Sequence, residues 1–244
     1  MDEKNPFGGI RTYDNYSHLW QLTGFILLLQ VAVSVLVFIL GDSLGVKFSP
    51  FESIIPALLV TGYTSWAMLD GLGVSWRAAL AEWNSQLPSD LKKALKYLAG
   101  YGLMLLIIVA ILMAAYWFWG AGLEKVMKPL EDRHAGESAR LAAAAVSRLR
   151  VLLVLFSACV VAPVVEEVFF RRIVFTTLRL KNGFWTSAFW AGLLFAVFHG
   201  AAAPLILPAG VYLCWVYERE RRLTINIMLH AMVNLIMVTL KLFL

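Results

Sequence analysis

Long stretches without a single charged side chain limit what this chain can fold into more than any other feature of its sequence. Asp, Glu, Lys and Arg are absent from residues 15–41, 97–123 and 182–217. A membrane-spanning helix needs about 20 mostly apolar residues, and each of these stretches supplies them. The whole chain is 60% hydrophobic and 15% charged, whereas a soluble domain carries about 25% charged residues. These patterns predict an all-α, polytopic transmembrane helical bundle rather than a soluble globule.

The apolar stretches divide into seven predicted spans. Gly200, Pro204 and Pro208 interrupt the stretch 182–217, which we therefore expect to hold two shorter helices. Residues 71–96 carry Trp76 and other apolar side chains at helical spacing beside charged ones, which predicts an amphipathic helix on the membrane surface. We expect a bundle of about seven to eight helices, with spans at 19–40, 53–69, 97–123, 151–178, 184–199, 205–217 and 223–240.

Two regions follow from this pattern. Residues 1–150 form an N-terminal membrane region with about three spans, the amphipathic helix and a polar loop at 124–150, and residues 151–244 form the membrane core that carries the polar motifs. The net charge of +5 comes from basic residues in short loops between apolar runs, a pattern typical of cytoplasmic loops and not of nucleic-acid binding. With a cytoplasmic N-terminus, three basic clusters lie on one side, at 77–96, 171–181 and 219–222.

Three segments break the apolar pattern with ionisable or amide side chains. They are Glu166–Arg172, Phe195–His199 and His230–Asn234. Because ionisable groups are costly at membrane depth, their presence there indicates a functional site. We expect the three segments to meet in an intramembrane polar cavity.

Helical spacing assigns faces to these side chains. Glu167 and Arg171 are four residues apart, so they share a face and can form an ion pair. Glu166 is turned about 100° from Glu167 and faces elsewhere. Pro163 removes a backbone hydrogen bond one turn earlier and is expected to kink the helix. A purely structural Glu167–Arg171 bridge is an alternative that spacing does not exclude.

Distances from the helix ends bring two of the segments to one level. Glu166 lies sixteen residues before the turn at 181–183, and His199 lies sixteen residues after it. At 1.5 Å per residue both are about 24 Å from the turn. His230 is eight residues past Arg222, about 12 Å into its own helix, which leaves a mismatch in depth. Phe195 precedes His199 by one turn and is expected to pack against the site.

The motifs Glu166-Glu167-x-x-x-Arg171, Phe195-x-x-x-His199 and His230-x-x-x-Asn234 resemble the signature of the CPBP intramembrane proteases. This family, also called Abi-like, includes type II CAAX prenyl endopeptidases and bacteriocin-processing or immunity proteins. The resemblance covers residues 162–235. The chain departs from the family pattern at Arg172, where members usually carry Gly, and a bulky cation there is expected to alter helix packing or the cavity mouth.

The resemblance implies an intramembrane endopeptidase that cleaves near the membrane-embedded or lipidated terminus of a protein or peptide substrate. Glu166 and His199 would activate a water molecule, His230 and Asn234 would stabilise the oxyanion, and Glu167, Arg171 and Phe195 would orient the site or bind substrate. Possible substrates are prenylated CAAX tails, bacteriocin leaders and C-terminal sorting tails. The implied location is a prokaryotic inner membrane, in which the protein is integral and multi-pass.

Whether a metal takes part is left open by the sequence. Zinc could be held by Glu166, His199 and His230, but the HExxH motif is absent and Asn234 is a poor zinc ligand. A metal-free mechanism without a cofactor is therefore the favoured hypothesis. A membrane transporter or a non-catalytic adaptor is the remaining alternative, because buried Glu and His residues also mark ion pathways.

Overall fold

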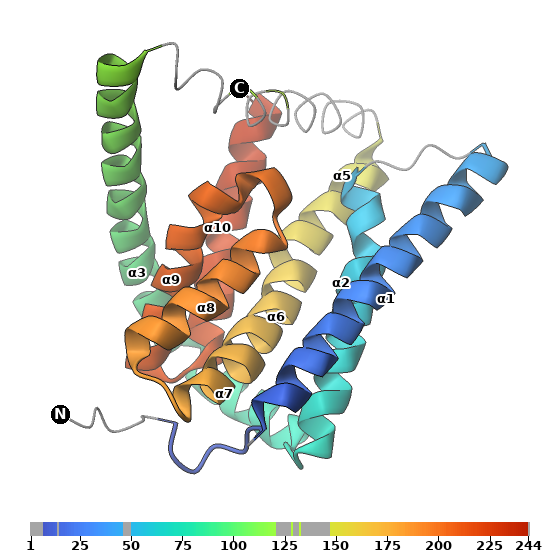
Figure 1. The fold of residues 1–244 in the computed structure, drawn as a ribbon, viewed down its shortest axis with the longest axis vertical. Coiled ribbons are helices and arrows are strands. Elements are labelled where there is room, and N and C mark those ends of the chain that lie inside the picture. The colour runs from blue at the N-terminus through green and yellow to red at the C-terminus, as the bar shows by residue number, and fades with distance from the viewer. Residues whose placement is uncertain are drawn as a thin grey trace.

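The computed structural model describes residues 7–13, 15–45, 50–120, 128, 132 and 147–243. Within these residues the chain forms seven continuous helical segments and no strand (Figure 1). The predicted all-α class is confirmed, and the helix count agrees with the prediction. Most of the predicted loop 124–150 lies outside the described residues.

The elements are α1 (Tyr16–Ser43), α2 (Pro50–Gly71), α3 (Trp76–Trp119), α5 (Arg148–Phe156), the π-helical η1 (Ser157–Val161), α6 (Ala162–Glu167), the π-helical η2 (Val168–Phe175), α7 (Thr176–Arg179), α8 (Phe184–Val197), the 3₁₀ turn η3 (Gly200–Ala202), α9 (Ala203–Glu220) and α10 (Leu223–Phe243).

Four helices are long and apolar enough to cross a membrane: α1, α3, the continuous segment from α5 to α7, and α10. Their outward faces carry large apolar side chains, such as Leu28 at 73% exposure and Trp117 at 86%, which a water-soluble protein would bury. The chain is therefore an integral, multi-pass membrane protein. The spans predicted in α2, α8 and α9 are not among the four, and α8 has only 14 residues.

Helix α3 differs from its prediction. The surface helix expected at 71–96 and the span expected at 97–123 are one helix of 44 residues, capped at its start by the Ser75 side chain. The change from amphipathic to apolar composition does not end it, because residues 76–99 contain no Gly and the helix continues through Pro88. It ends at Gly120, whose positive φ of 46° suits a helix terminus. Its C-terminal part stands at the edge of the bundle (Figure 1).

The helix from α5 to α7 contains two π-helical stretches, η1 and η2, on either side of α6. Pro163 was expected to kink this helix, and in the structure the turn that precedes it is π-helical. In η1 the N–H of Ala162 bonds the carbonyl of Ser157, five residues back. Such π-helical turns occur mostly at functional sites, and here they flank both glutamates.

Helices α8 and α9 pack side by side as an antiparallel hairpin (Figure 1). Two glycines make this contact close: a Cβ added at Gly210 would lie 2.9 Å from the Cα and 3.0 Å from the carbonyl oxygen of Gly192. Small residues let helix backbones approach in a membrane, where van der Waals packing holds helices together. The hairpin brings Phe195 of α8 to the interior of the bundle.

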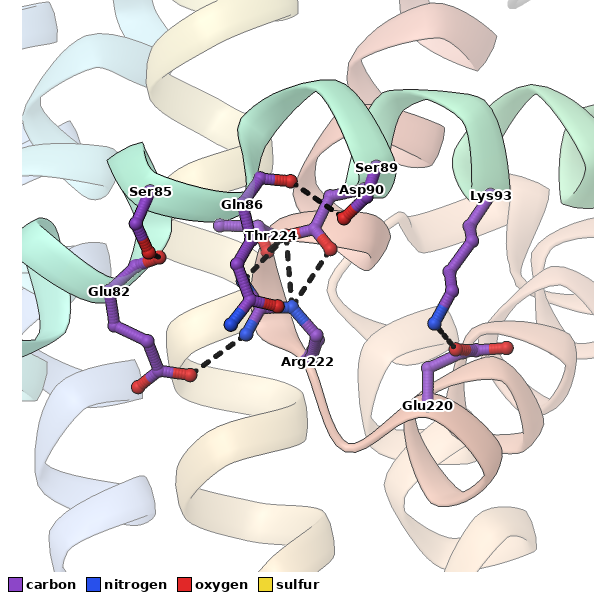
Figure 2. A network of polar contacts seen from close by, with 9 residues as sticks. All are labelled: Glu82, Ser85, Gln86, Ser89, Asp90, Lys93, Glu220, Arg222 and Thr224. Atoms are coloured by element: carbon purple, nitrogen blue, oxygen red, sulfur yellow. Dashed lines mark hydrogen bonds and ion pairs between the residues drawn. The ribbon is translucent and has the colours of Figure 1, made fainter.

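The three predicted basic clusters meet at one end of the bundle, where polar contacts join distant helices. Arg179 pairs with Glu218 at 2.7 Å, so the cluster at 171–181 meets the last turns of α9. Figure 2 shows how Arg222 joins Asp90 and Glu82 of α3 to the turn between α9 and α10. Hydrogen bonding to Asp90 raises the pKa of Arg222 above its ordinary value. These contacts attach the N-terminal part of α3 to the bundle.

The close approach of α8 and α9 leads to a test of the fold. Gly210→Ala should lower the free energy of unfolding by about 1–3 kcal/mol, because its methyl group would overlap backbone atoms that cannot move aside. Gly102→Ala in α3 is the matched control, since a Cβ there meets no atom within 4 Å. It should leave stability unchanged or raise it, because alanine is the better helix former. Detergent unfolding followed by circular dichroism compares the two variants, and equal stabilities would contradict the close contact.

Candidate active site

A buried polar cluster surrounds Glu167 at the end of α6. His230 Nδ1 of α10 lies 2.8 Å from Glu167 Oε1, and Asn226 Nδ2 donates to Oε2 at 3.2 Å. Arg171 Nε is 3.1 Å from the same Oε2, so the predicted ion pair is present. Glu167, Arg171 and Asn226 have no exposed surface, and His230 has 6%. A buried carboxylate is stable only with such partners.

The contact with Glu167 orients the His230 ring. A carboxylate oxygen only accepts hydrogen bonds, so Nδ1 of His230 carries the proton in this contact. The opposite nitrogen, Nε2, then faces Glu166, whose Oε2 is 3.7 Å away. His230 thus lies between two carboxylates that are consecutive in the sequence.

Glu166 differs from its neighbour in what it contacts. Its Oε2 is buried and accepts no hydrogen bond from any of the described residues, whereas both oxygens of Glu167 are bonded. The turn of about 100° between consecutive helical residues explains this difference, because it points the two side chains to different neighbours. Glu166 is therefore the carboxylate of the pair with an oxygen that accepts no hydrogen bond among the described residues.

Phe195 links the second motif to this cluster. Its ring centroid lies 4.6 Å from that of His199 and 5.8 Å from that of His230. The Arg171 guanidinium carbon lies 4.5 Å from the Phe195 ring centroid, at cation–π distance. The Nδ1–H of His199 donates to the Phe195 carbonyl at 2.8 Å, since that oxygen only accepts. The structure thus places Phe195 between the two histidines.

Asn234 has a backbone partner that explains its position. Its Nδ2 donates to the carbonyl oxygen of Ala158 in η1, at 2.8 Å. Continuing the π-helical pattern would require a donor on residue 163, five residues after Ala158, but Pro163 has no N–H. The Asn234 amide therefore satisfies the carbonyl that Pro163 leaves without a donor. One of its two N–H groups is used in this way, and one remains.

Sequence reasoning missed Asn226. It precedes His230 by four residues, as His230 precedes Asn234, so all three lie on one face of α10. That repeat was the signal that could have identified it. The structure also resolves the mismatch in depth: His230 contacts both glutamates although its helix enters the bundle at a different level. The helices are tilted relative to one another in Figure 1, so counting residues from each end misjudges relative depth.

The geometry bears on the zinc alternative. Among the described residues, no three His, Cys, Asp or Glu side chains are placed so that they could hold a metal ion together. Glu166 and Glu167 face opposite nitrogens of the His230 ring, so one ion could not bind both carboxylates and that ring. The set Glu166, His199 and His230 therefore does not fit a metal as it stands.

Comparison with known proteins supports a family assignment. Residues 148–236 match the sequence model of the family described as type II CAAX prenyl endopeptidase Rce1-like. A Bacillus subtilis (strain 168) protein named "Putative membrane peptidase YdiL" is 29% identical over 94 residues, which cover 38% of this chain and 38% of that protein. The chain thus aligns with less than half of this relative's length. Its bacterial source fits the predicted prokaryotic location.

No solved structure matches the chain significantly. The matched segment, residues 148–236, contains every candidate catalytic residue, from Glu166 to Asn234. Over residues 148–236 the chain is therefore similar in sequence to the Rce1-like, type II CAAX prenyl endopeptidases.

Proposed function

We propose that the protein is an intramembrane endopeptidase that hydrolyses a peptide bond near the membrane-embedded or lipidated terminus of a protein or peptide substrate. The observation that carries the proposal is the position of His230 between two carboxylates: Glu167, both of whose oxygens are hydrogen-bonded, and Glu166, whose Oε2 accepts no hydrogen bond from the described residues. The family match and the peptidase-named relative support the same activity. The partners are then the bilayer and a membrane-associated substrate.

In the proposed reaction Glu166 is the general base. It takes a proton from a water molecule while the water oxygen attacks the scissile carbonyl carbon. His199, which the family resemblance assigns to the same step, helps to position and polarise that water. The resulting oxyanion collapses, the C–N bond breaks, and the proton held by Glu166 passes to the leaving amine. The products are a new carboxyl terminus and a new amino terminus.

His230 and Asn234 stabilise the oxyanion in this scheme. His230 donates through Nε2 when both of its ring nitrogens carry protons, and the two flanking carboxylates offset the charge of that form. Asn234 donates with the N–H that is not used by Ala158. Because the Ala158 carbonyl fixes the orientation of the amide, this donor is preorganised, which is what oxyanion stabilisation requires.

Glu166→Gln should abolish cleavage and leave the protein folded and able to bind substrate. Glutamine keeps the shape of the side chain but cannot accept the proton of water, and losing an interaction made in the transition state lowers turnover more than binding. The measurement is cleavage of prenylated and unprenylated peptides by purified protein in lipid, followed by mass spectrometry. Full activity of this variant would refute the proposal.

The same experiment separates the alternatives. Metal content is measured on the purified protein, and a chelator is added before the substrate. Stoichiometric zinc together with chelator-sensitive turnover that zinc restores would leave a protease but overturn the metal-free mechanism. No cleavage of any peptide by the native chain, with substrate-dependent ion flux in vesicles, would favour a transporter.

Glu167 and Arg171 are expected to act as an orienting pair. Replacing either one alone should lower stability by about 3–5 kcal/mol, because it leaves the other charge buried without its partner. The exchange Glu167→Arg with Arg171→Glu should recover part of the loss, as measured by unfolding and by turnover of the folded fraction. A Glu167→Gln variant that is normally folded and has no activity, together with no recovery in the exchange, would instead assign Glu167 to the chemistry.

Asn234 has two roles that a double substitution can separate. Asn234→Ala should cost about 10²–10³ in turnover through the oxyanion and about 1–3 kcal/mol in stability through the unpaired Ala158 carbonyl. Adding Pro163→Ala restores an N–H at residue 163 within reach of the helix carbonyls. Stability should then return and turnover should not. If turnover also returns, Asn234 only supports the helix and is not an oxyanion donor.

A further inference from the structure

A cavity of about 180 Å³ lies at the basic end of the bundle, where α3 and α10 begin. Its lining includes Trp76 from the first turn of α3, Arg172 from η2, and Arg221 and Arg222 from the turn before α10. None of the proposed catalytic residues lines it. Val168, which follows Glu167 directly, does, so the cavity is a neighbour of the candidate active site and is separate from it.

Two residues of the cavity lining each carry a buried hydrogen-bond donor without an acceptor. The donors are Nη1 of Arg172 and Nε1 of Trp76, and neither has a partner among the residues that the structure describes. The other terminal nitrogen of Arg172, Nη2, donates to the Arg11 carbonyl at 3.0 Å, which fixes the side chain. Buried donors are nearly always bonded in native proteins. Two such donors on residues that line one cavity therefore indicate an acceptor that both side chains reach when it binds there.

The charges around the cavity indicate that this acceptor is an anion. Arg222 is already paired with Asp90 and with Glu82, the acidic residue of the lining. Arg172 and Arg221 form no ion pair with a carboxylate among the residues that the structure describes, so the lining retains positive charge. Trp76 is the first residue of α3, and helix N-termini favour negative groups.

Backbone strain at the rim adds an independent observation. Arg221 adopts φ 54°, and among the described residues it is the one non-glycine with positive φ. Arginine is unusual in this conformation, which glycine ordinarily supplies at a helix end. Residues held in such conformations cluster at ligand sites. Here the strained residue carries a cation to the cavity.

From these observations we infer that the cavity binds the phosphate group of an anionic phospholipid. Phosphate accepts from guanidinium and indole N–H groups together, and basic pockets at the cytoplasmic end of a helix bundle suit lipid headgroups. Trp83 and Leu69 add apolar surface for the glycerol and the first carbons of the acyl chains. Arg172 supplies the central donor and is not one of the proposed catalytic residues, so the site is separate from the protease mechanism.

The test uses the full chain, purified in a neutral detergent and titrated with phosphatidylglycerol or phosphatidylcholine. Native mass spectrometry counts the retained lipid and gives its affinity. Arg172→Gln and Trp76→Phe should each weaken phosphatidylglycerol binding by about 10-fold, the effect of losing one charge-assisted or buried hydrogen bond. Arg77→Gln is the matched control, because Arg77 is an exposed arginine of the same helix that does not line the cavity. It should change the affinity less than about 2-fold.

Several outcomes would overturn the inference. Unchanged binding in both cavity variants would show that the lipid does not bind in the cavity. Equal affinity for the two lipids would show that the site does not prefer an anionic lipid. Inorganic phosphate that displaces the lipid at equal affinity would make free phosphate the occupant. A peptide displacing the lipid through its terminal carboxylate would assign the cavity to substrate. Trp76→Phe keeps an aromatic ring in place, so the inference can be tested even if Arg172→Gln fails to fold.

Discussion

The buried carboxylate of Glu167 is the group on which the rest of the site depends. It has no exposed surface, so its charge persists only because Arg171, His230 and Asn226 surround it. Two of these partners, His230 and Asn226, come from α10. Because both contact one carboxylate of α6, they fix the position of α10 along α6. The same contacts set the ring of His230, which in turn presents its second nitrogen to Glu166. The neighbour of the candidate base thus organises the site, and the base itself retains a buried oxygen that accepts no hydrogen bond from the residues that the structure describes.

Irregular helix geometry makes room for this arrangement. The π-helical stretches η1 and η2 enclose α6, and each leaves backbone groups that an α-helix would pair differently. At η1, Pro163 has no N–H to donate to the Ala158 carbonyl. The side chain of Asn234 on α10 donates to that carbonyl instead. The π-helical turn at η1 and the contact between α10 and that turn therefore depend on the same side chain. That side chain, Asn234, is also the candidate oxyanion donor. The stability of this segment and the position of its amide should vary together, which is the basis of the Pro163 double substitution.

The basic end of the bundle combines anchoring with a second site. Arg222 holds the long helix α3 through Asp90 and Glu82 (Figure 2), and the adjacent cavity collects the donors of Arg172 and Trp76. An anionic headgroup bound there would contact η2 at Arg172, five to six residues after the paired glutamates. Lipid composition could then act on the site through the helix that carries both, without any contact between lipid and substrate.

The sequence by itself determined the features that depend on local composition and spacing. Apolar runs determined the membrane helices, the i to i+4 spacing determined the Glu167–Arg171 pair, and three polar motifs indicated the family that residues 148–236 match. Only the tertiary structure decided the features that join distant residues. Asn226 reaches Glu167 across 59 residues, His230 bonds Glu167 through Nδ1 and faces Glu166 with Nε2, and α3 runs unbroken where composition predicted two elements. Helix tilt, ring orientation and π-helical turns set these contacts, and they result from packing between helices, which spacing within a single helix does not encode.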